Sequence, residues 1–357
     1  MELLSVTMND GVKPRSEIEG KDNSSEDKSN YKIVRKGDMV YNSMRMWQGA
    51  NGISPCDGIV SPAYTVLMPT QEINNGYFAA LFKSANMINE FRKNSQGMTS
   101  DTWNLKYPQI ETIKIQIPSV SEQDKVSELF GVLDARIVAQ AQLVESLKKY
   151  KRGVVRTLLS PKHCSIKNVK WTTSRIGDIG IFIKGAPLSK ADISLEGTPF
   201  ILYGELYTTY SEVISNVVRK TQASVDKQYY SQIGDVIIPT SGETPEEIST
   251  ASCVMLPDII LAGDLNIYRC TQVDGRIMSY ILNHVVNDRI ARIAQGKSIV
   301  HVQAADISKI EITYPDPFSQ KTIIAILAAI SDRIDQSNAE LRLLNELRKA
   351  LLQKLFI

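Results

Sequence analysis

SEQDKVSELFGVLDARIVAQAQLVESLKKYKRGVVRTLLS, residues 121–160, is the stretch that decides the fold. It contains no proline, and its apolar residues recur in steps of three and four, from Val126 through Leu143 to Leu158. This spacing predicts one long amphipathic helix, with Ser121 as its cap just after Pro118. About forty residues rising 1.5 Å each give a rod of roughly 60 Å.

The end of the chain has the same design. Residues 330–334 (ISDRI) echo residues 133–137 (LDARI), and an apolar stripe runs from Ile323 to Leu355. Two seams of equal length and near-heptad spacing pair most simply with each other. We therefore predict that residues 119–160 and 317–357 are two long spacer helices that form an antiparallel coiled coil. The competing interpretation, burial of each helix in the core of its own domain, is disfavoured by their length.

Charged residues near the end of the first helix are expected to form a solvated face, with a basic strip near a phosphate backbone as the alternative. These residues are Lys148, Lys149, Lys151, Arg152 and Arg156.

The repeat extends well beyond the helices. Gly37-Asp38 and Gly234-Asp235 lie 197 residues apart, and Pro118 and Pro315 keep the same offset. The Gln-Gly pair occurs at Gln96 and again at Gln295, with a slightly larger offset of 199 residues. A register kept across most of the chain indicates a tandem duplication, and two copies of one module suit two similar targets.

The two globular parts, residues 1–118 and 169–316, are predicted to be mixed α/β (α+β) domains with a linker at residues 161–168. Expected strands cover residues 39–41, 64–67, 113–117, 236–238, 266–269 and 310–314. Expected helices cover residues 78–91 and 277–293, and the polar residues 16–30 are expected to be a mobile loop.

The two copies do not begin alike. Leu3-Leu4 aligns with Phe200-Ile201, yet the second copy has about thirty residues ahead of that point, from Val169 onward. The first domain is therefore expected to be N-terminally truncated and to lack a strand. Three explanations stay open: a truncated gene, an engineered start, or a strand supplied by a partner.

Composition excludes several classes of protein. The 41 basic and 39 acidic residues give a net charge of +2. Any binding of nucleic acid would therefore depend on local basic patches and not on the overall charge. The four cysteines lie far apart without metal-ligand spacing, which is typical of reduced thiols in a cytoplasmic protein. No apolar run approaches the roughly 20 residues that span a bilayer.

Catalytic motifs are absent from the sequence. There is no Walker A loop, GxGxxG, HExxH or GxSxG. Asp316-Pro317-Phe318 matches part of the Asp/Asn-Pro-Pro-aromatic motif of adenine methyltransferases but lacks the second proline, and the repeat places it at a strand-to-helix turn. We therefore predict no catalytic residue, no metal site and no enzyme activity for the chain alone.

Two loop positions in each copy carry side chains suited to reading DNA, because Arg, Lys, Gln, Ser and Thr reach base edges and phosphates from turns. We call the loop after the Gly-Asp strand the first slot; it comprises residues 42–49 in the first copy and 239–244 in the second. We call the region beside or after Gln-Gly the second slot; it includes residues 98–100 and 297–301. These slots supply most candidates. The predicted DNA-binding residues of these slots are Arg45, Trp47, Gln48, Lys93, Thr99, Ser241, Thr244, Lys297, Ser298 and His301. Four further phosphate candidates are Lys13, Arg15, Lys184 and Lys190. The alternative for any single residue is an ordinary surface turn.

These residues resemble the specificity subunit of type I restriction-modification systems. The resemblance covers essentially the whole chain. It lies in LLSVTMNDGV (residues 3–12), YKIVRKGDMVYNSMRMWQGANGISPCDGIVSPAYTVL (31–67), IPSVSEQDKVSELFGVLDARI (117–137) and PTSGETPEEISTASCV (239–254).

The resemblance implies two target-recognition domains on antiparallel spacer helices, each domain reading half of a gapped, bipartite site on double-stranded DNA. It also implies no catalysis by this chain. Two modification subunits would bring S-adenosylmethionine, and restriction subunits would use ATP and Mg. The truncated first domain departs from the family, so a protein-interaction scaffold that no longer reads DNA through that domain is the second hypothesis. An enzyme acting alone is the third and is disfavoured, since no cofactor site is visible.

Overall fold

The computed structural model describes the chain except for residues 9, 21, 23, 100–101, 295–299 and 357. The chain divides into two compact units. The first unit comprises Met1–Val144 and Gln336–Ile357, and the second comprises Glu145–Asp335. Both boundaries fall inside the long helices, so each unit contains part of both.

Two small sheets form the globular part of the first unit. In the first sheet, β1 lies between an antiparallel β2 and a parallel β6, which also pairs with β3. In the second, β4 is central, with β5 and β7 antiparallel on either side. The strands are β1 (Glu2–Thr7), β2 (Gly11–Pro14), β3 (Lys32–Val34), β4 (Met39–Asn42), β5 (Asn51–Ile53), β6 (Gly58–Val60) and β7 (Tyr64–Leu67).

Short helices cover this second sheet. They are η2 (Met46–Gln48), α1 (Asn75–Leu81), α2 (Ala85–Asn94) and α3 (Tyr107–Glu111). A further short helix, η1 (Arg15–Glu17), contacts β1 of the first sheet. The single helix predicted over residues 78–91 is wrong, because the chain breaks after α1 and restarts at Ser84. The Ser84 hydroxyl accepts a hydrogen bond from the Met87 N–H at 3.3 Å and so caps α2.

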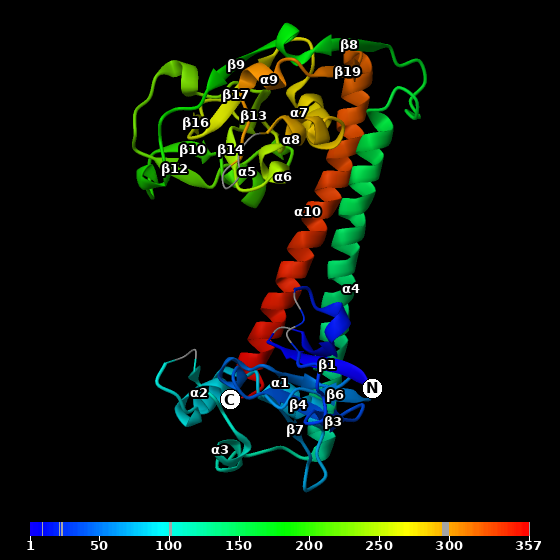
Figure 1. Ribbon diagram of the computed structural model, residues 1–357, viewed down its shortest axis with the longest axis vertical. Coiled ribbons are helices and arrows are strands. Elements are labelled where there is room, and N and C mark those ends of the chain that lie inside the picture. Colours follow the sequence, from blue (N-terminus) through cyan, green and yellow to red (C-terminus); the bar gives the residue numbers. More distant parts are fainter. Residues whose placement is uncertain (9, 21, 23, 100–101, 295–299, 357) are drawn as a thin grey trace. The chain divides into compact units, whose positions relative to one another are not determined.

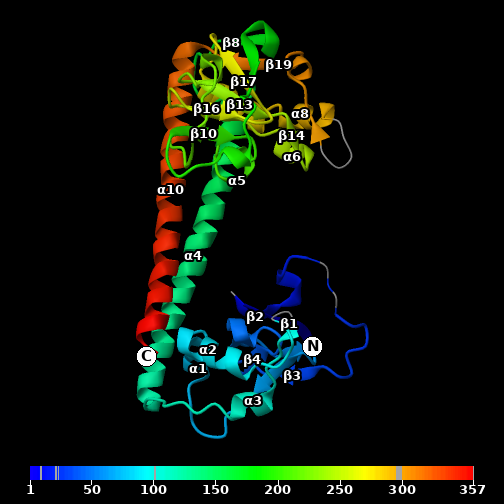
Figure 2. The same ribbon diagram turned by 90° about the vertical axis from the view of Figure 1, so that its left-hand side faces the viewer.

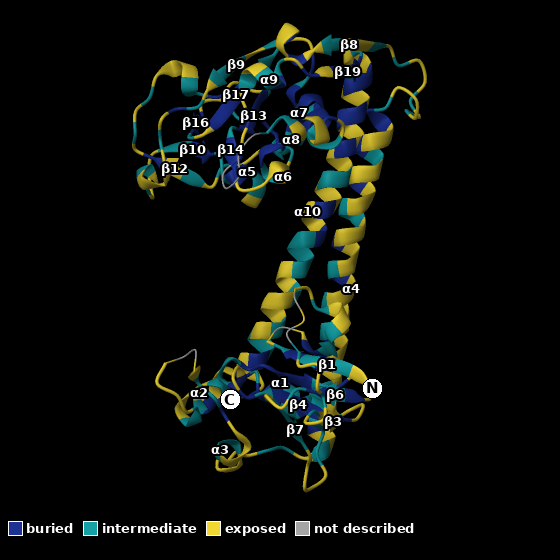
Figure 3. Cartoon of the chain, viewed as in Figure 1, coloured by how far each residue is buried: buried dark blue, intermediate teal, exposed yellow. Residues whose placement is uncertain are grey.

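A larger sheet, in the order β11-β15-β13-β17-β9, forms the centre of the second unit. Its middle strand β13 is buried along its whole length (Figure 3). A second sheet, in the order β12-β10-β16, repeats the pairing around β1, with one antiparallel and one parallel neighbour. Two further pairs are β14 with β18 and β8 with β19.

The strands of the second unit are β8 (Trp171–Arg175), β9 (Gly180–Lys184), β10 (Thr198–Leu202), β11 (Val213–Ile214), β12 (Arg219–Thr221), β13 (Asp235–Pro239), β14 (Ser241–Gly242), β15 (Ser252–Val254), β16 (Ile260–Ala262), β17 (Leu265–Cys270), β18 (Val300–His301) and β19 (Glu311–Pro315). The helices are η4 (Ile176–Asp178), η5 (Lys190–Asp192), α5 (Glu205–Thr208), η6 (Lys227–Tyr229), α6 (Pro245–Ile248), α7 (Gly275–His284), α8 (Asn287–Ile293) and α9 (Ala304–Ile307). The helix predicted over residues 277–293 is thus also two helices.

The two long helices are α4 (Val120–Leu158) and α10 (Pro317–Lys354), and both views show them side by side (Figures 1 and 2). In the first unit the Gln140 amide donates to the Ser337 carbonyl at 3.0 Å, and Arg136 pairs with Glu340. Asp134, earlier in α4, pairs with Arg348, later in α10. The helices therefore run antiparallel, which confirms the predicted pairing.

Each long helix also contributes to the globular cores, which the favoured interpretation of the sequence did not include. In the first unit, Phe130 stacks on Phe356 with ring centroids 5.9 Å apart, within the core that covers β4. In the second unit, Val155 of α4 and Ile323 of α10 lie in the large core with β13 and α7. Apolar residues of both long helices therefore pack into the globular cores.

The start of each long helix is held by the same contact. Gln123 donates from Nε2 to the Pro118 carbonyl at 3.0 Å and accepts the Asn74 N–H at 2.9 Å. Gln320 donates to the Pro315 carbonyl at 2.8 Å and accepts the Asp274 N–H at 2.8 Å. The duplication is therefore structural as well as sequential.

The strand predicted over residues 113–117 is wrong. Its repeat counterpart β19 is a strand because it pairs along its length with β8. Within the described part of the first unit no strand occupies the position of β8, and residues 113–119 form no regular element. An apolar alternation becomes a strand only where a neighbour takes up its backbone hydrogen bonds.

Within the described residues, no helix is both long enough and apolar enough to cross a membrane.

Candidate nucleic-acid interface

The two predicted slots of the second unit meet. β14 carries Ser241 from the first slot and pairs antiparallel with β18, which carries His301 from the second. The Val302 N–H extends the contact by donating to the Thr240 carbonyl at 3.1 Å. His301 is exposed on this two-stranded pair.

Two of the predicted residues in this unit serve the fold itself. Ser241 is buried, and its hydroxyl donates to the Asp264 carboxylate at 3.0 Å. Thr244 caps α6 by accepting the Glu247 N–H at 3.2 Å. Lys297 and Ser298 lie outside the described residues. Of the three predicted residues of these slots that the structure describes, Thr244 and His301 are exposed to solvent.

The two slots of the first unit also meet. Trp47, in η2, packs edge-on against Trp103 from the segment after the second slot, with ring centroids 5.2 Å apart. The Arg92 guanidinium of α2 lies 5.8 Å from the Trp47 ring centroid, a cation–π distance. The Trp47 indole N–H donates to the Met44 carbonyl at 3.1 Å, which holds the ring in place.

Basic and polar side chains surround this tryptophan pair. Arg45 is exposed directly before η2, and Gln48 is half-buried at the end of η2. Lys93, also exposed, forms an ion pair with Glu90 at 2.7 Å within α2. Thr99 is exposed, and its backbone N–H is held by the Thr102 hydroxyl at 3.1 Å. An aromatic pair flanked by arginines can stack on bases and contact phosphates.

The four additional phosphate candidates are not brought into these slots by any contact of the described residues. Lys13, in β2, pairs with Asp10 at 3.5 Å. Arg15 donates to the Ile18 and Gly20 carbonyls at 2.6 and 3.0 Å, which organises its own loop. Lys184 is exposed at the end of β9, and Lys190 is exposed in η5.

Sequence reasoning missed two residues of these sites. Trp103 follows the second slot of the first copy, and only the contact with Trp47 shows its importance. Asp264 lies in the turn between β16 and β17, and accepts the Ser241 hydroxyl there. An aromatic residue at the end of a polar loop is a usable signal for the first, whereas no spacing rule links Asp264 to Ser241.

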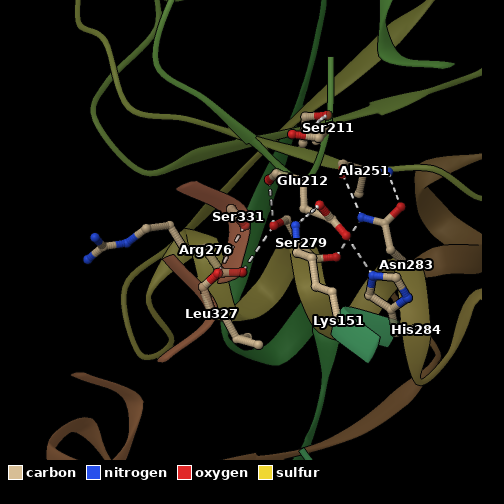
Figure 4. A network of polar contacts seen from close by, with 11 residues as sticks. Lys151, Ser211, Glu212, Ala251, Arg276, Ser279, Asn283, His284, Leu327 and Ser331 are labelled. Carbon is tan, nitrogen blue, oxygen red and sulfur yellow. Dashed lines mark hydrogen bonds and ion pairs between the residues drawn. The ribbon is translucent and has the colours of Figure 1, made fainter. Parts of the chain in front are cut away.

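A buried polar network docks α4 on the globular part of the second unit (Figure 4). The Lys151 ammonium of α4 lies 2.8 Å from one Glu212 carboxylate oxygen, and His284 Nε2 lies 2.7 Å from the other. Lys151 also lies 5.4 Å from the centroid of the Tyr280 ring. Lys151 is only 9% exposed, so its assignment to a solvated face is wrong.

Burial raises the pKa of the Glu212 carboxyl, but the hydrogen bond from His284 and the charge of Lys151 outweigh it and lower the pKa to about 2. The carboxylate is therefore ionised at neutral pH. Its oxygens are used by α4 and α7, so the network is a structural lock and not a catalytic site.

Asp316 is a helix cap, as the structural interpretation of Asp316-Pro317-Phe318 predicted. Its carboxylate accepts the Ser319 hydroxyl at 2.8 Å and the Lys170 N–H at 3.0 Å, and these bonds lower its pKa to about 2. Among the described residues, no group of three His, Cys, Asp or Glu side chains is placed to hold a metal ion.

Comparison with known proteins agrees with this architecture. The family described as Type I restriction modification DNA specificity domain matches residues 168–346, half of the chain. The chain belongs to this family. The match runs from just before β8 into α10 and so covers the slots of the second unit and the network residues Glu212 and His284, but not Lys151.

One curated relative of this specificity-domain chain is the putative type I restriction enzyme MjaX specificity subunit of Methanocaldococcus jannaschii. It is 23% identical over 294 residues, which are 78% of this chain and 66% of the relative. The chain thus spans slightly less than two thirds of that relative.

Two solved structures share the fold. One, described as showing complex assembly and conformational transition of the type I R-M system, has a TM-score of 0.60 and 17% identity. The match covers 93% of this chain and 84% of that one. The other is the S subunit of a type I restriction-modification system from M. genitalium, with a TM-score of 0.58 and 16% identity. That match covers 91% of this chain and 84% of the subunit.

Proposed function

We propose that the chain is the DNA-sequence-recognition and scaffold subunit of a type I restriction-modification complex. Residues 1–118 and 169–316 act as two target-recognition domains, each reading half of a gapped, bipartite site. The observation that carries the proposal is that, in each repeat, the two loops richest in groove-reading residues meet at one place. Membership of the specificity-domain family supports it.

The two repeats present different side chains at that place. The first offers an aromatic pair with Arg45 and Arg92, and the second offers His301 and Thr244. Because direct readout depends on the donors and acceptors presented to the base edges, the two domains are expected to prefer different sequences.

The long helices supply the scaffold of the proposal. α4 exposes apolar side chains in both units, among them Val132 and Val138 in the first and Tyr150 in the second. Exposed apolar side chains along a helix favour protein docking. We assign this face to two modification subunits, and the antiparallel pairing of α4 and α10 to setting the spacing of the half-sites. Restriction subunits complete the complex.

The chain itself has no catalytic role in this proposal. S-adenosylmethionine, ATP and Mg belong to the partner subunits, and the complex acts on DNA in the cytoplasm.

Selection of bound DNA from a randomised library tests the proposal. The chain is assembled with its modification subunits, and bound duplexes are sequenced. Two blocks of preferred bases separated by a stretch without preference are expected. Bound duplexes with no shared sequence would overturn the proposal.

A protein-interaction scaffold whose first domain no longer reads DNA is the second candidate. It is favoured by one observation, the unpaired residues 113–117 of the first unit. In the same selection this candidate predicts a single block of preferred bases, which His301→Ala would change and Arg45→Ala would not.

A further inference from the structure

Two edges of the first unit lack a neighbour that their counterparts in the second unit possess. The first is the segment of residues 113–117, which has isoleucine at every second position. The offset of 197 residues aligns it with β19. β19 is paired along its whole length with β8, whereas the structure shows no described residue paired with residues 113–117. Ile115, at its centre, is 38% exposed.

The second edge is the outer side of β7. Val40 of β4 lies opposite Val66 of β7, just as Ile237 of β13 lies opposite Ile267 of β17. β17 is bonded to β13 on one side and to β9 on the other, whereas β7 ends its sheet within the described residues. Met68, directly after β7, is 83% exposed. An edge with exposed apolar side chains is a template for another strand.

One continuous segment fills both positions in the second unit. β8 covers β19, the chain turns through η4, and β9 then covers β17. The Tyr268 hydroxyl donates to the Ile176 carbonyl in that turn at 2.8 Å, and the Tyr268 ring lies 4.7 Å from the Phe182 ring. A Cβ at Gly180 would overlap Tyr268, so this position must stay small.

We propose that the first unit accepts a strand–turn–strand segment from a second polypeptide, with the chemistry of Trp171–Arg175 and Gly180–Lys184. Its first stretch would lie antiparallel to residues 114–118. Its second, beginning with a small residue and continuing with alternating large apolar ones, would lie antiparallel to β7. Backbone hydrogen bonds supply the affinity in this mode of recognition, and alternate side chains supply the specificity. The inference concerns a polypeptide partner and goes beyond the proposed DNA recognition.

The pairing of β8 with β19 indicates which backbone amides of residues 113–117 would bond to the incoming segment. The Ile176 N–H donates to the Ile310 carbonyl at 3.0 Å, and the Asp316 N–H donates to the Lys170 carbonyl at 2.8 Å. Bonded and non-bonded pairs alternate in an antiparallel ladder, so Ile312 lies at a bonded position and Thr313 does not. Ile115 is the counterpart of Ile312, and Gln116 is the counterpart of Thr313.

Hydrogen exchange on the full-length chain tests the proposal. The probe is a synthetic peptide with the sequence of residues 169–185, VKWTTSRIGDIGIFIKG. At a peptide concentration ten times its Kd, the amides of Ile115 and Ile117, and those of β7 that face away from β4, are expected to exchange about tenfold more slowly. The amides of β19 and β17, which already have partners, should not change.

Two proline variants make the result specific. Ile115→Pro removes a donor that binding needs and that the free chain leaves unbonded, so it should abolish the protection without changing Tm. Gln116→Pro, at a non-bonded position, is the matched control and should keep the protection. Unchanged exchange at both edges, or protection that survives Ile115→Pro, would overturn the proposal. Neither outcome depends on DNA, so a failure here is separate from a failure of DNA recognition.

Discussion

Arg15 and Arg45 show that a basic residue near a turn can have two different roles. Both follow short polar stretches, and both are candidates for contacting DNA. The Arg15 guanidinium donates to two backbone carbonyls and lies 3.6 Å from the Asp22 carboxylate, which ties down its loop. Within the described residues the Arg45 side chain has no hydrogen bond or ion pair. A loop carbonyl leaves no signature in the sequence, so spacing alone does not separate these roles.

Arg45→Ala is therefore expected to weaken DNA binding by the assembled complex without lowering the Tm of the chain. Loss of a groove or phosphate contact costs about 1–3 kcal/mol. A titration of labelled target DNA measures the change. Arg35→Ala is the matched control, because Arg35 is another exposed arginine of the same unit, paired with Asp57 at 3.2 Å. Equal affinities for the two variants would contradict a DNA contact by Arg45.

Lys151 illustrates a second limit of prediction from sequence at this scale. It stands in a run of basic residues in α4, and such runs usually form a solvated face. Its partner Glu212, and His284 on the other Glu212 oxygen, come from distant parts of the chain, and no local pattern connects the three. The burial of a charge depends on which surface packs against it, which the helical period does not specify.

At the scale of elements, this lock between α4 and the second unit has a predictable pH dependence. The Glu212 carboxyl has a folded pKa of about 2, below its ordinary value of 4.5. Its contribution to stability is therefore fully present above pH 4.5 and is lost as the pH falls toward 2. A shift of this size corresponds to about 3 kcal/mol.

Glu212→Gln is expected to lower the free energy of unfolding of the second unit by about 3 kcal/mol at pH 7, because it leaves the Lys151 charge buried and unpaired. It should also reduce the loss of stability between pH 4.5 and 2, to which Asp316 contributes as well. Urea unfolding, followed through the exchange of β13 amides, measures both effects. Glu243→Gln, at an exposed position, is the control. An acid dependence equal to that of the wild type would show that the Glu212 pKa is not lowered by the fold.

Elements differ in how far their own sequence determines them. The long helices α4 and α10 were predicted nearly to their ends, because a helix bonds within itself and its apolar period is local. The alternation in residues 113–117 is as regular as that of β19, yet it is not a strand. A strand needs a neighbour, and in the first unit the described residues do not provide one. The break after α1 was missed because it depends on a cap at a single residue, Ser84.

At the scale of the whole molecule, the duplication is the feature that sequence predicted best. The offset of 197 residues anticipated the equivalent contacts of Gln123 and Gln320. It did not predict that the two slots of each repeat meet. Side chains that differ between the copies, such as Trp103 and Asp264, could not be assigned from the repeat. A repeat shows what the copies share and does not show what distinguishes them.

The proposed function requires both repeats to read DNA, each its own half of one site. Mapping methylated adenines across the genome of cells that contain this chain and its modification subunits tests it most directly. We expect one motif made of two specific blocks separated by a gap of constant length, with only one block altered by changes in residues 169–316. A motif with a single continuous block, or methylation without any motif, would contradict it.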